Sequence, residues 1–196
     1  MVSRRPTRAT TARQRILTAA KEELVATGEL EVAGVCRRAG VSIGLPYRYF
    51  DNRSALLVAV VDEFYLQLWQ AALGPEYPQS SWAEREQARI KDWVAFLYTE
   101  PLSVLVLGGL TGDSAVAAAN QRQLREITDV GATNIARAQR NGELSASRDP
   151  QLLSAAVLAG VHAATATALE RDERPTPHDL AIEIWLFVKG AVGLRN

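Results

Sequence analysis

The chain has 196 residues, of which 47% are hydrophobic and 22% are charged, with equal numbers of basic and acidic side chains. This length suffices for one medium domain or for a small domain joined to a larger one, and the single cysteine, Cys36, excludes an internal disulfide and a multi-cysteine zinc site. No apolar segment of a signal peptide follows the basic N-terminus, and no run of roughly 18 uncharged apolar residues is evident. We therefore expect a cytoplasmic protein without a membrane span.

Charge is distributed unevenly along the sequence. Residues 1–53 contain ten basic and five acidic residues, a net charge of +5, and residues 54–196 carry the compensating −5. A basic segment on a neutral chain predicts that a polyanion binds at one end of the molecule rather than over its whole surface. We expect two domains, here named the head (residues 1–53) and the body (residues 54–196).

Helical periodicity runs through almost the whole chain, and no convincing pair of strands is found. Thr11 and Gln14 form a capping-box pattern at the start of the first predicted helix, and Ser42 is placed to cap the third. The head is predicted to hold helices at about 11–27, 32–39 and 42–50. The body is predicted to hold six more helices. The first three run from Asn52 to the loop at 74–81, over 82–98 and over 102–107. The last three run from the glycines at 108–112 to about 140, from Pro150 to the charged linker at 170–175, and from Pro177 past Ala191.

Residues 32–50, with the sequence VAGVCRRAGVSIGLPYRYF, have the pattern of a helix-turn-helix. Ala39 allows two helices to cross closely, Gly40 supplies a left-handed turn, and Val41 fills the space between the helices. Ser42 then begins a helix whose amide-rich N-terminus can face a phosphate group.

The run from Ala39 to Ser42, then Gly44, the segment from Tyr47 to Phe50, and Arg53 followed by Ala55-Leu56-Leu57 resemble the signature of the tetracycline-repressor (TetR) family. The first helix, with Arg15 to Ala20 and its end at Gly28, resembles it as well. The close match covers about the first quarter of the chain. It implies an all-α, nine-helix architecture, with a three-helix head that binds DNA and a helical body for ligand binding and dimerisation.

The resemblance also implies roles for residues of the head. The third helix would enter the major groove, Tyr47 and Tyr49 would contact the DNA backbone, and Arg53 would contact a phosphate. An arm with three arginines would follow the backbone or reach a minor groove. The residues expected to bind DNA are Arg4, Arg5, Arg8, Arg37, Ser42, Ile43, Gly44, Leu45, Tyr47, Arg48, Tyr49 and Arg53. For Arg37 the solvated face of its helix is the more usual role, although it lies close enough to the duplex to contribute.

Three features depart from the family pattern. Pro46 stands where an apolar Leu or Ile is usual and removes the first bond to the Ser42 carbonyl, so the recognition helix is expected to start later or to tilt. Ile43 and Leu45 replace polar residues, so base recognition would rely on thymine methyl groups. The connection after Gly28 is short and lacks a helix-opening threonine, which removes a phosphate contact.

A ligand cavity and a dimer interface are implied for the body. The expected cavity wall comprises Trp69, Trp93, Leu97, Leu105, Leu124, Thr128 and His162. No Lys or Arg interrupts these rows, so the expected effector is a small, largely apolar molecule; packing in the core is the alternative role for His162 and the tryptophans. Small residues on the helix at 150–170 and bulky ones on the last helix predict a four-helix homodimer interface with Ala156, Gly160, Ala163, Ala164, Trp185 and Val188.

An enzyme is not expected. The chain has two histidines, no nucleophile elbow, no phosphate-binding loop and no helical metal-ligand spacing, and Glu84 and Glu86 lie in a stretch that looks solvated. We expect no metal and no cofactor.

The predicted function is a repressor that an effector releases from double-stranded operator DNA. The alternatives are a ligand-independent or activating regulator of the same fold, and a helical protein-interaction module that has lost DNA binding, which Pro46 would favour.

Overall fold

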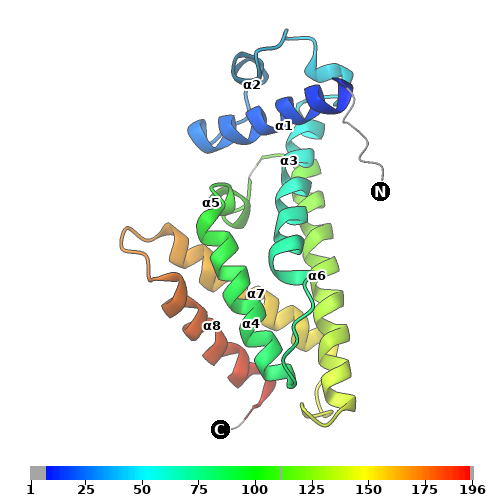
Figure 1. The fold of residues 1–196 in the computed structure, drawn as a ribbon, viewed down its shortest axis with the longest axis vertical. Helices are drawn as coiled ribbons and strands as arrows, with labels where there is room; N and C mark the ends of the chain where they lie inside the picture. The colour runs from blue at the N-terminus through cyan, green and yellow to red at the C-terminus, as the bar shows by residue number, and fades with distance from the viewer. Residues whose placement is uncertain (1–7, 111, 195–196) are drawn as a thin grey trace.

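The computed structural model describes residues 8–110 and 112–194, and no strand occurs among them. Figure 1 shows the helices of the fold in chain order. The α-helices are α1 (Arg8–Thr27), α2 (Val32–Ala39), α3 (Arg53–Leu68), α4 (Trp82–Thr99), α5 (Ser103–Leu107), α6 (Ser114–Arg140), α7 (Pro150–Glu170) and α8 (Pro177–Val192). Two short irregular helices complete the fold, the 3₁₀ turn η1 (Pro46–Arg48) and the π-helical segment η2 (Trp69–Leu73).

The all-α class is confirmed, and two details of the expected plan are corrected. The third of the nine predicted helices is not an α-helix but the single turn η1, so the described residues form eight α-helices. The first helix begins at Arg8, ahead of Thr11. Thr11 therefore lies within α1 and does not form its N-cap.

Local capping residues set most helix boundaries. The Asn52 side chain accepts a hydrogen bond of 2.8 Å from the Ala55 amide at the start of α3. Asp149 before Pro150 and Thr176 before Pro177 cap α7 and α8 in the same way. Gly40 ends α2 in the left-handed conformation, with φ of 62°.

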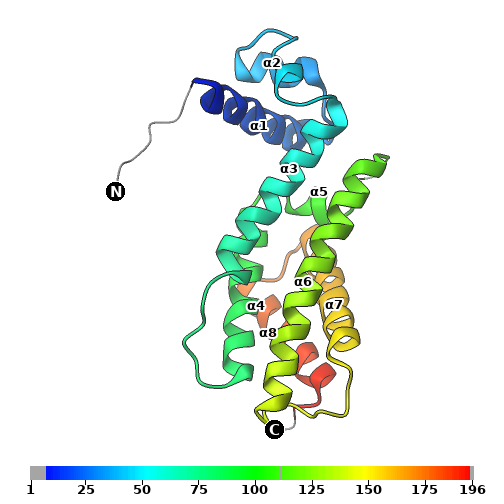
Figure 2. The same ribbon diagram turned by 90° about the vertical axis from the view of Figure 1, so that its right-hand side faces the viewer.

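The helices extend from the head at one end to the C-terminus at the other. Figures 1 and 2 show α1 and α2 together at the head end, α3 running from there into the body, and the long α6 beside it. The core is continuous along α3, where Leu56, Val60 and Phe64 are all buried. Phe64 meets Phe96 of α4 in an edge-to-face contact with ring centroids 5.6 Å apart. Head and body therefore share one helix and one core.

Two segments, Arg53–Leu73 and Pro150–Glu170, are long and apolar enough to cross a membrane by length and composition. One or two such helices are a weak sign of a membrane protein, because the core helices of soluble folds meet the same criteria. Arg53–Leu73 contains the central core helix α3. Pro150–Glu170 is α7, which packs on α6 and exposes small residues on its other side. Helix packing within this fold accounts for the apolar character of both.

Candidate nucleic-acid interface and ligand cavity

The turn after α2 reverses the chain as the sequence predicts. The Gly40 amide donates to the Arg37 carbonyl at 3.3 Å, and the Val41 amide donates to the Cys36 carbonyl at 3.1 Å. The Cys36 side chain is buried, and burial raises the pKa of its thiol. This turn places Ser42, Ile43 and Gly44 on the surface at the end of the head.

The segment after the turn does not form the recognition helix predicted at 42–50. Pro46 has no amide hydrogen to donate to the Ser42 carbonyl, and the Leu45 amide donates to that carbonyl instead, at 3.0 Å. The Arg48 amide bonds to the Leu45 carbonyl at 3.1 Å, again with three-residue spacing. Ser42 therefore caps no α-helix, and the region is a series of tight turns around η1. The expected effect of Pro46 is stronger than a late start or a tilt.

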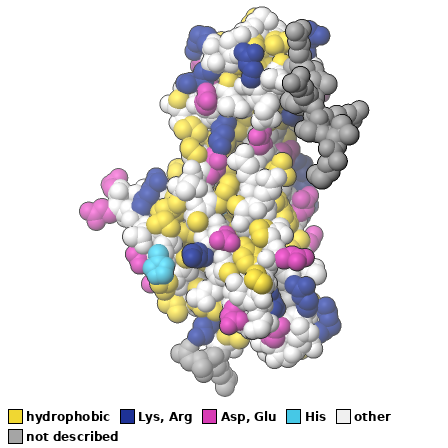
Figure 3. Space-filling model, in the orientation of Figure 1, with side chains coloured by type: hydrophobic (Ala, Val, Ile, Leu, Met, Phe, Trp, Pro, Cys, Tyr) yellow, Lys and Arg dark blue, Asp and Glu magenta, His cyan; other side chains and the backbone are white. Residues whose placement is uncertain are grey.

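Most of the residues expected to bind DNA lie on one exposed end of the head. Ile43 is 59% exposed and Tyr47 is 52% exposed, while Leu45 and Tyr49 are half-buried and pack against the core. The exposed members are Arg37, Ser42, Ile43, Gly44, Tyr47, Arg48 and Arg53. Arg4, Arg5 and the side chain of Arg8 lie outside the described residues. Figure 3 shows basic side chains on several sides of the head end and most of the acidic ones over the body.

Arg53 holds the head to the body in addition to being exposed. Its Nε donates to the Leu30 carbonyl at 2.8 Å, and its Nη1 lies 4.0 Å from Asp113 Oδ2. The Ser54 hydroxyl donates to Asp113 at 2.6 Å, and this bond lowers the pKa of Asp113. Asp113 also caps α6. The phosphate contact predicted for Arg53 therefore competes with these intramolecular contacts.

The sequence analysis missed an ion pair in the head that contains a buried acid. Glu23 of α1 is 4% exposed and pairs with Arg38 of α2. Gly34 makes room for it, since a Cβ atom at Gly34 would lie 1.8 Å from Glu23 Oε1. The signal in the sequence is an acidic residue on the inner face of α1 opposite a glycine of α2. Arg38 is thus committed to the fold.

A second polar link joins α1 to the end of α4. Lys21 Nζ lies 2.6 Å from Glu100 Oε2, and the Glu100 side chain is 8% exposed. Its other oxygen accepts a hydrogen bond of 3.1 Å from the Leu102 amide, just before α5. The C-terminal end of α4 is therefore fixed to the head.

The body contains a small, partly open cavity of about 90 Å³ that is lined by residues of α4, α6 and α7, with Leu73 of η2 and Val188 of α8. Among the residues that were predicted to form the cavity wall, Trp93 lines this cavity. Leu97 is buried in the core, Trp69 and Leu105 are half-buried against it, and Leu124 borders a separate open hollow of about 630 Å³ beside α5 and α6. Thr128 donates to the carbonyl of Leu124 within α6. The buried Nε2 of His162 has no hydrogen-bond partner among the described residues, and burial lowers the pKa of this histidine.

The cavity contains charged side chains, contrary to the expectation of an uncharged wall. Glu86 and Arg89 form an ion pair, with side chains only 19% and 17% exposed, so Glu86 is not in a solvated stretch. Together with Ile90 and Trp93 they occupy positions i, i+3, i+4 and i+7 of α4, which share one face of a helix. This spacing is the signal that marks the two charged residues as facing the body.

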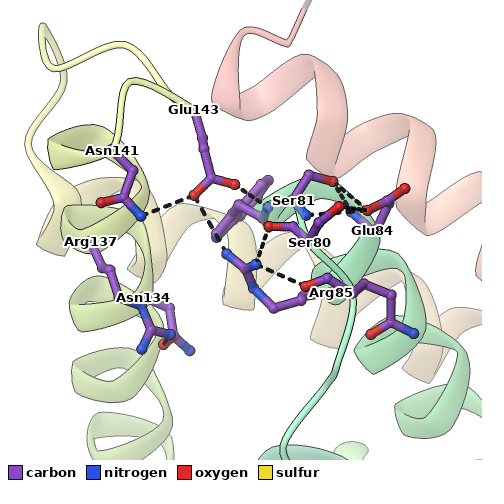
Figure 4. A network of polar contacts seen from close by, with 10 residues as sticks. Ser80, Ser81, Glu84, Arg85, Asn134, Arg137, Asn141 and Glu143 are labelled. Atoms are coloured by element: carbon purple, nitrogen blue, oxygen red, sulfur yellow. Dashed lines mark hydrogen bonds and ion pairs between the residues drawn. The ribbon is translucent and has the colours of Figure 1, made fainter.

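The N-terminal end of α4 is fixed by a polar network that connects it to the turn after α6 (Figure 4). Ser81 and Glu84 form a capping box. Glu143 accepts hydrogen bonds from the Trp82 amide and from Asn141, and lies 3.5 Å from Arg85 Nη2. The Trp82 amide is the main cause of the lowered pKa of Glu143. Both ends of the helix that carries the charged pair are thus anchored.

One face of α7 and α8 exposes apolar side chains. Leu186 is 55% exposed and Phe187 is 46% exposed, and Ala156, Ala163 and Ala164 lie on the surface of α7. Val188, predicted to lie in the dimer interface, is 1% exposed and belongs to the core of its own subunit; Trp185 is half-buried against that core. Gly160 lies under the Phe187 ring, where a Cβ would approach Cζ to 2.4 Å.

No group of three or more His, Cys, Asp or Glu side chains in the described part of the chain is arranged to hold a metal ion. The structure thus offers three surfaces or spaces for partners. They are the exposed end of the head, the cavity with the charged pair, and the apolar face of α7 and α8.

Comparison with known proteins identifies the fold. No protein-family model and no curated protein sequence matches the chain. Among solved structures, the transcriptional regulator FadR from Bacillus subtilis, in complex with stearoyl-CoA, aligns with a TM-score of 0.80 and 15% identity over 91% of this chain and 98% of that one. SmeT, the repressor of a multidrug efflux pump of Stenotrophomonas maltophilia, aligns at 0.76 and 20% identity, over 91% and 89%. A regulator of the TetR/AcrR family from Thermobifida fusca aligns at 0.70 and 19% identity, over 95% and 100%. The chain has the fold of these regulators along nearly its whole length.

Proposed function

We propose that this chain is a cytoplasmic transcriptional regulator of the TetR family, which binds operator DNA as a homodimer and acts as a repressor that a small effector releases. The observation that carries the proposal is the exposed end of the head. Arg37, Ser42, Tyr47 and Arg48 are exposed together there, on a segment with net positive charge. Cationic and amide donors on one convex end suit contact with phosphates.

The apolar face of α7 and α8 supports the homodimer. Leu186 and Phe187 are exposed beside the small residues of α7, and contiguous apolar surface on a helical domain favours association with a second copy. A two-fold axis through this face would fix the distance between two heads. The proposed effector would act by shifting the population between head spacings.

The cavity and the anchored helix α4 support the proposal that a small effector binds in the body. FadR of Bacillus subtilis, with the same fold, is solved with stearoyl-CoA, and SmeT is a repressor. In this chain, α4 contributes Glu86, Arg89 and Trp93 to the cavity, and its C-cap residue Glu100 contacts Lys21 of the head. A shift of α4 around a ligand would therefore be transmitted to α1.

A second candidate function is a protein-interaction module that does not recognise operator DNA. The replacement of the recognition helix by η1 favours it, because a single 3₁₀ turn presents fewer side chains to a major groove than an α-helix does.

A mobility-shift titration with the DNA upstream of the protein's own coding region tests the proposal. Replacing Arg48 with Ala should weaken binding to specific and random DNA alike and reduce the slope of log affinity against log salt by about one unit, because one phosphate contact is lost. Tyr47→Phe should also weaken binding to specific and random DNA, since it removes the hydroxyl group that would contact the DNA backbone. Arg125→Ala, on the exposed surface of α6, is the control. Wild-type protein that binds neither specific nor random DNA at low salt would favour the second candidate.

A further inference from the structure

The ion pair between Glu86 and Arg89 occupies an unusual place for two charges. An i, i+3 pair on an amphipathic helix normally lies on the solvated face, but this one lines a cavity with Ile127, Val157 and Val161 from α6 and α7. Removing two charges from water carries a large free-energy cost that an apolar pair of the same size would avoid. Packing alone does not explain these two residues.

The two charged side chains of the pair differ in the number of groups that stabilise their charge. Arg89 contacts both Glu86 and the face of the Tyr77 ring, whose centroid lies 5.0 Å from the guanidinium carbon. Glu86 has Arg89 as its partner, and burial raises the pKa of Glu86 despite the attraction of that cation. The guanidinium is therefore better stabilised in the cavity than the carboxylate is.

The same helix face carries a hydrogen-bond donor that has no acceptor. Trp93 is 5% exposed and lines the cavity, and its indole nitrogen is buried without a partner among the described residues. A buried N–H group without an acceptor costs free energy that a suitable ligand would recover. Arg89 and Trp93, four residues apart on α4, thus present a cation and an unsatisfied donor to an otherwise largely apolar space.

We propose that this cavity binds a small apolar carboxylic acid, whose carboxylate replaces Glu86 on Arg89 and accepts a hydrogen bond from Trp93. The apolar part of the ligand would lie against the side chains of α6 and α7. That this ligand acts as the effector rests on the proposed function. That it binds to the free protein does not depend on that function. The sequence predicts a small, largely apolar effector without a charged partner in the cavity wall, and this proposal adds a carboxylate to it.

The size of the cavity limits the ligand. A cavity of about 90 Å³ is smaller than one of about 150 Å³ that holds benzene, so even a small aromatic acid requires one wall to move. The irregular π-helical segment η2 supplies Leu73 to that wall, and π-helical turns are less regular than the α-helices that form the other walls. A long acyl chain would require a larger rearrangement than a single ring does.

Release of Glu86 from Arg89 gives ligand binding a dependence on pH. Once displaced, the buried carboxylate loses the nearby cation that lowers its pKa, so it binds a proton more readily when the ligand anion is present. Arg89 of α4 and Tyr77 of the preceding loop are the ionisable groups that face Glu86, while α6 and α7 contribute the uncharged Asn134 and Ser154 to the cavity. Affinity for the acid should therefore rise as pH falls, as long as the ligand itself stays ionised.

The test is calorimetric titration of the DNA-free, full-length protein with three probes that differ in one group: phenylacetate, 2-phenylethanol and 2-phenylethylamine. The acid should bind most tightly. Arg89→Met should weaken its binding by about tenfold or more, the effect of losing one charge-assisted contact. Glu86→Gln should strengthen acid binding at neutral pH and remove its pH dependence, an effect that a misfolded variant would not show. Glu84→Gln, on the exposed cap of the same helix, is the matched control.

Three outcomes would overturn the proposal: equal or tighter binding of the alcohol or the amine, acid binding that Arg89→Met leaves unchanged, and no binding of any of the three probes at millimolar concentration. Since no DNA is present, each result is independent of whether the protein binds an operator.

Discussion

The head buries one acidic side chain, Glu23, within its own fold and leaves most of its other charges on the surface, whereas the body places a charged pair in a cavity and apolar side chains on its surface. In the head, Arg38 pairs with buried Glu23 and Arg53 bonds to the Leu30 carbonyl, so the net charge overstates the number of cations available to DNA. In the body, the ordinary distribution of polar and apolar residues is inverted at the cavity and on α7 and α8. Such inversions mark places where a ligand or another subunit completes the structure.

The largest effect is expected from introducing a charge into the apolar face of the body. Leu186→Glu should give a helical monomer whose affinity for operator DNA falls by about 100-fold, because two linked heads bind far more tightly than one. Sedimentation velocity and a mobility shift measure the two effects. Ala95→Glu, on the exposed surface of α4, should leave the dimer intact. Gly160 is unsuitable for this experiment, since a side chain there would displace Phe187 within the subunit.

If the Leu186→Glu protein sediments as a dimer, the face of α7 and α8 is not the interface between subunits. The outward-facing apolar side chains of the body would then need a different partner.

A smaller effect on stability is expected where the head buries Glu23. In Gly34→Ala, the new methyl group would occupy the position of the Glu23 carboxylate and expel it from Arg38. The free energy of unfolding should fall by about 1 to 3 kcal/mol, as is typical of overpacked cores. Denaturant unfolding measures it, and Gly44→Ala, with open space around its Cβ position, is the control for stability. Equal midpoints for the two variants would show that Glu23 moves aside without cost.

The smallest effect concerns the unpaired histidine of α7. Burial lowers the pKa of His162, so the folded state binds a proton less readily than the unfolded chain does. Above the unfolded value of 6.5, the imidazole is neutral in both states and contributes nothing to the pH dependence of stability. As pH falls below that value, the unfolded chain is protonated first and stability decreases.

Thermal unfolding at neutral and mildly acidic pH should therefore show a shallower loss of stability in His162→Gln than in the wild type. The exposed His178→Gln serves as control. An identical pH slope for His162→Gln and the wild type would contradict the assignment of this effect to His162.

The sequence predicts best those features that depend on neighbouring residues. Asn52, Asp149-Pro150 and Thr176-Pro177 begin helices as expected, because a cap acts on amides within three residues of itself. Pro46 was identified as a disturbance for the same reason, although its full effect depends on the bonds that the Leu45 amide makes in its place.

Features that depend on distant parts of the chain were not predicted. The cavity lies where α6 and α7 pack closely, at Gly131 and Ser154, and a Cβ on Gly131 would lie 2.3 Å from the Ser154 hydroxyl oxygen. Most of the wall expected from the sequence lies elsewhere in the body, because helical periodicity shows which face of a helix is inward but not what it faces. Glu86 was assigned to solvent for the same reason.

The contact between Lys21 and Glu100 has a consequence for the construction of hybrid sensors. Grafting a foreign head onto this body, with the junction before α3, would preserve the continuous core helix but replace the residue at position 21. A graft with a neutral side chain there would lose the ion pair to the end of α4, and we expect it to bind its operator without responding to ligand. Compatibility between donor and acceptor domains then depends on this ion pair as well as on the contacts of Arg53 with the Leu30 carbonyl and Asp113.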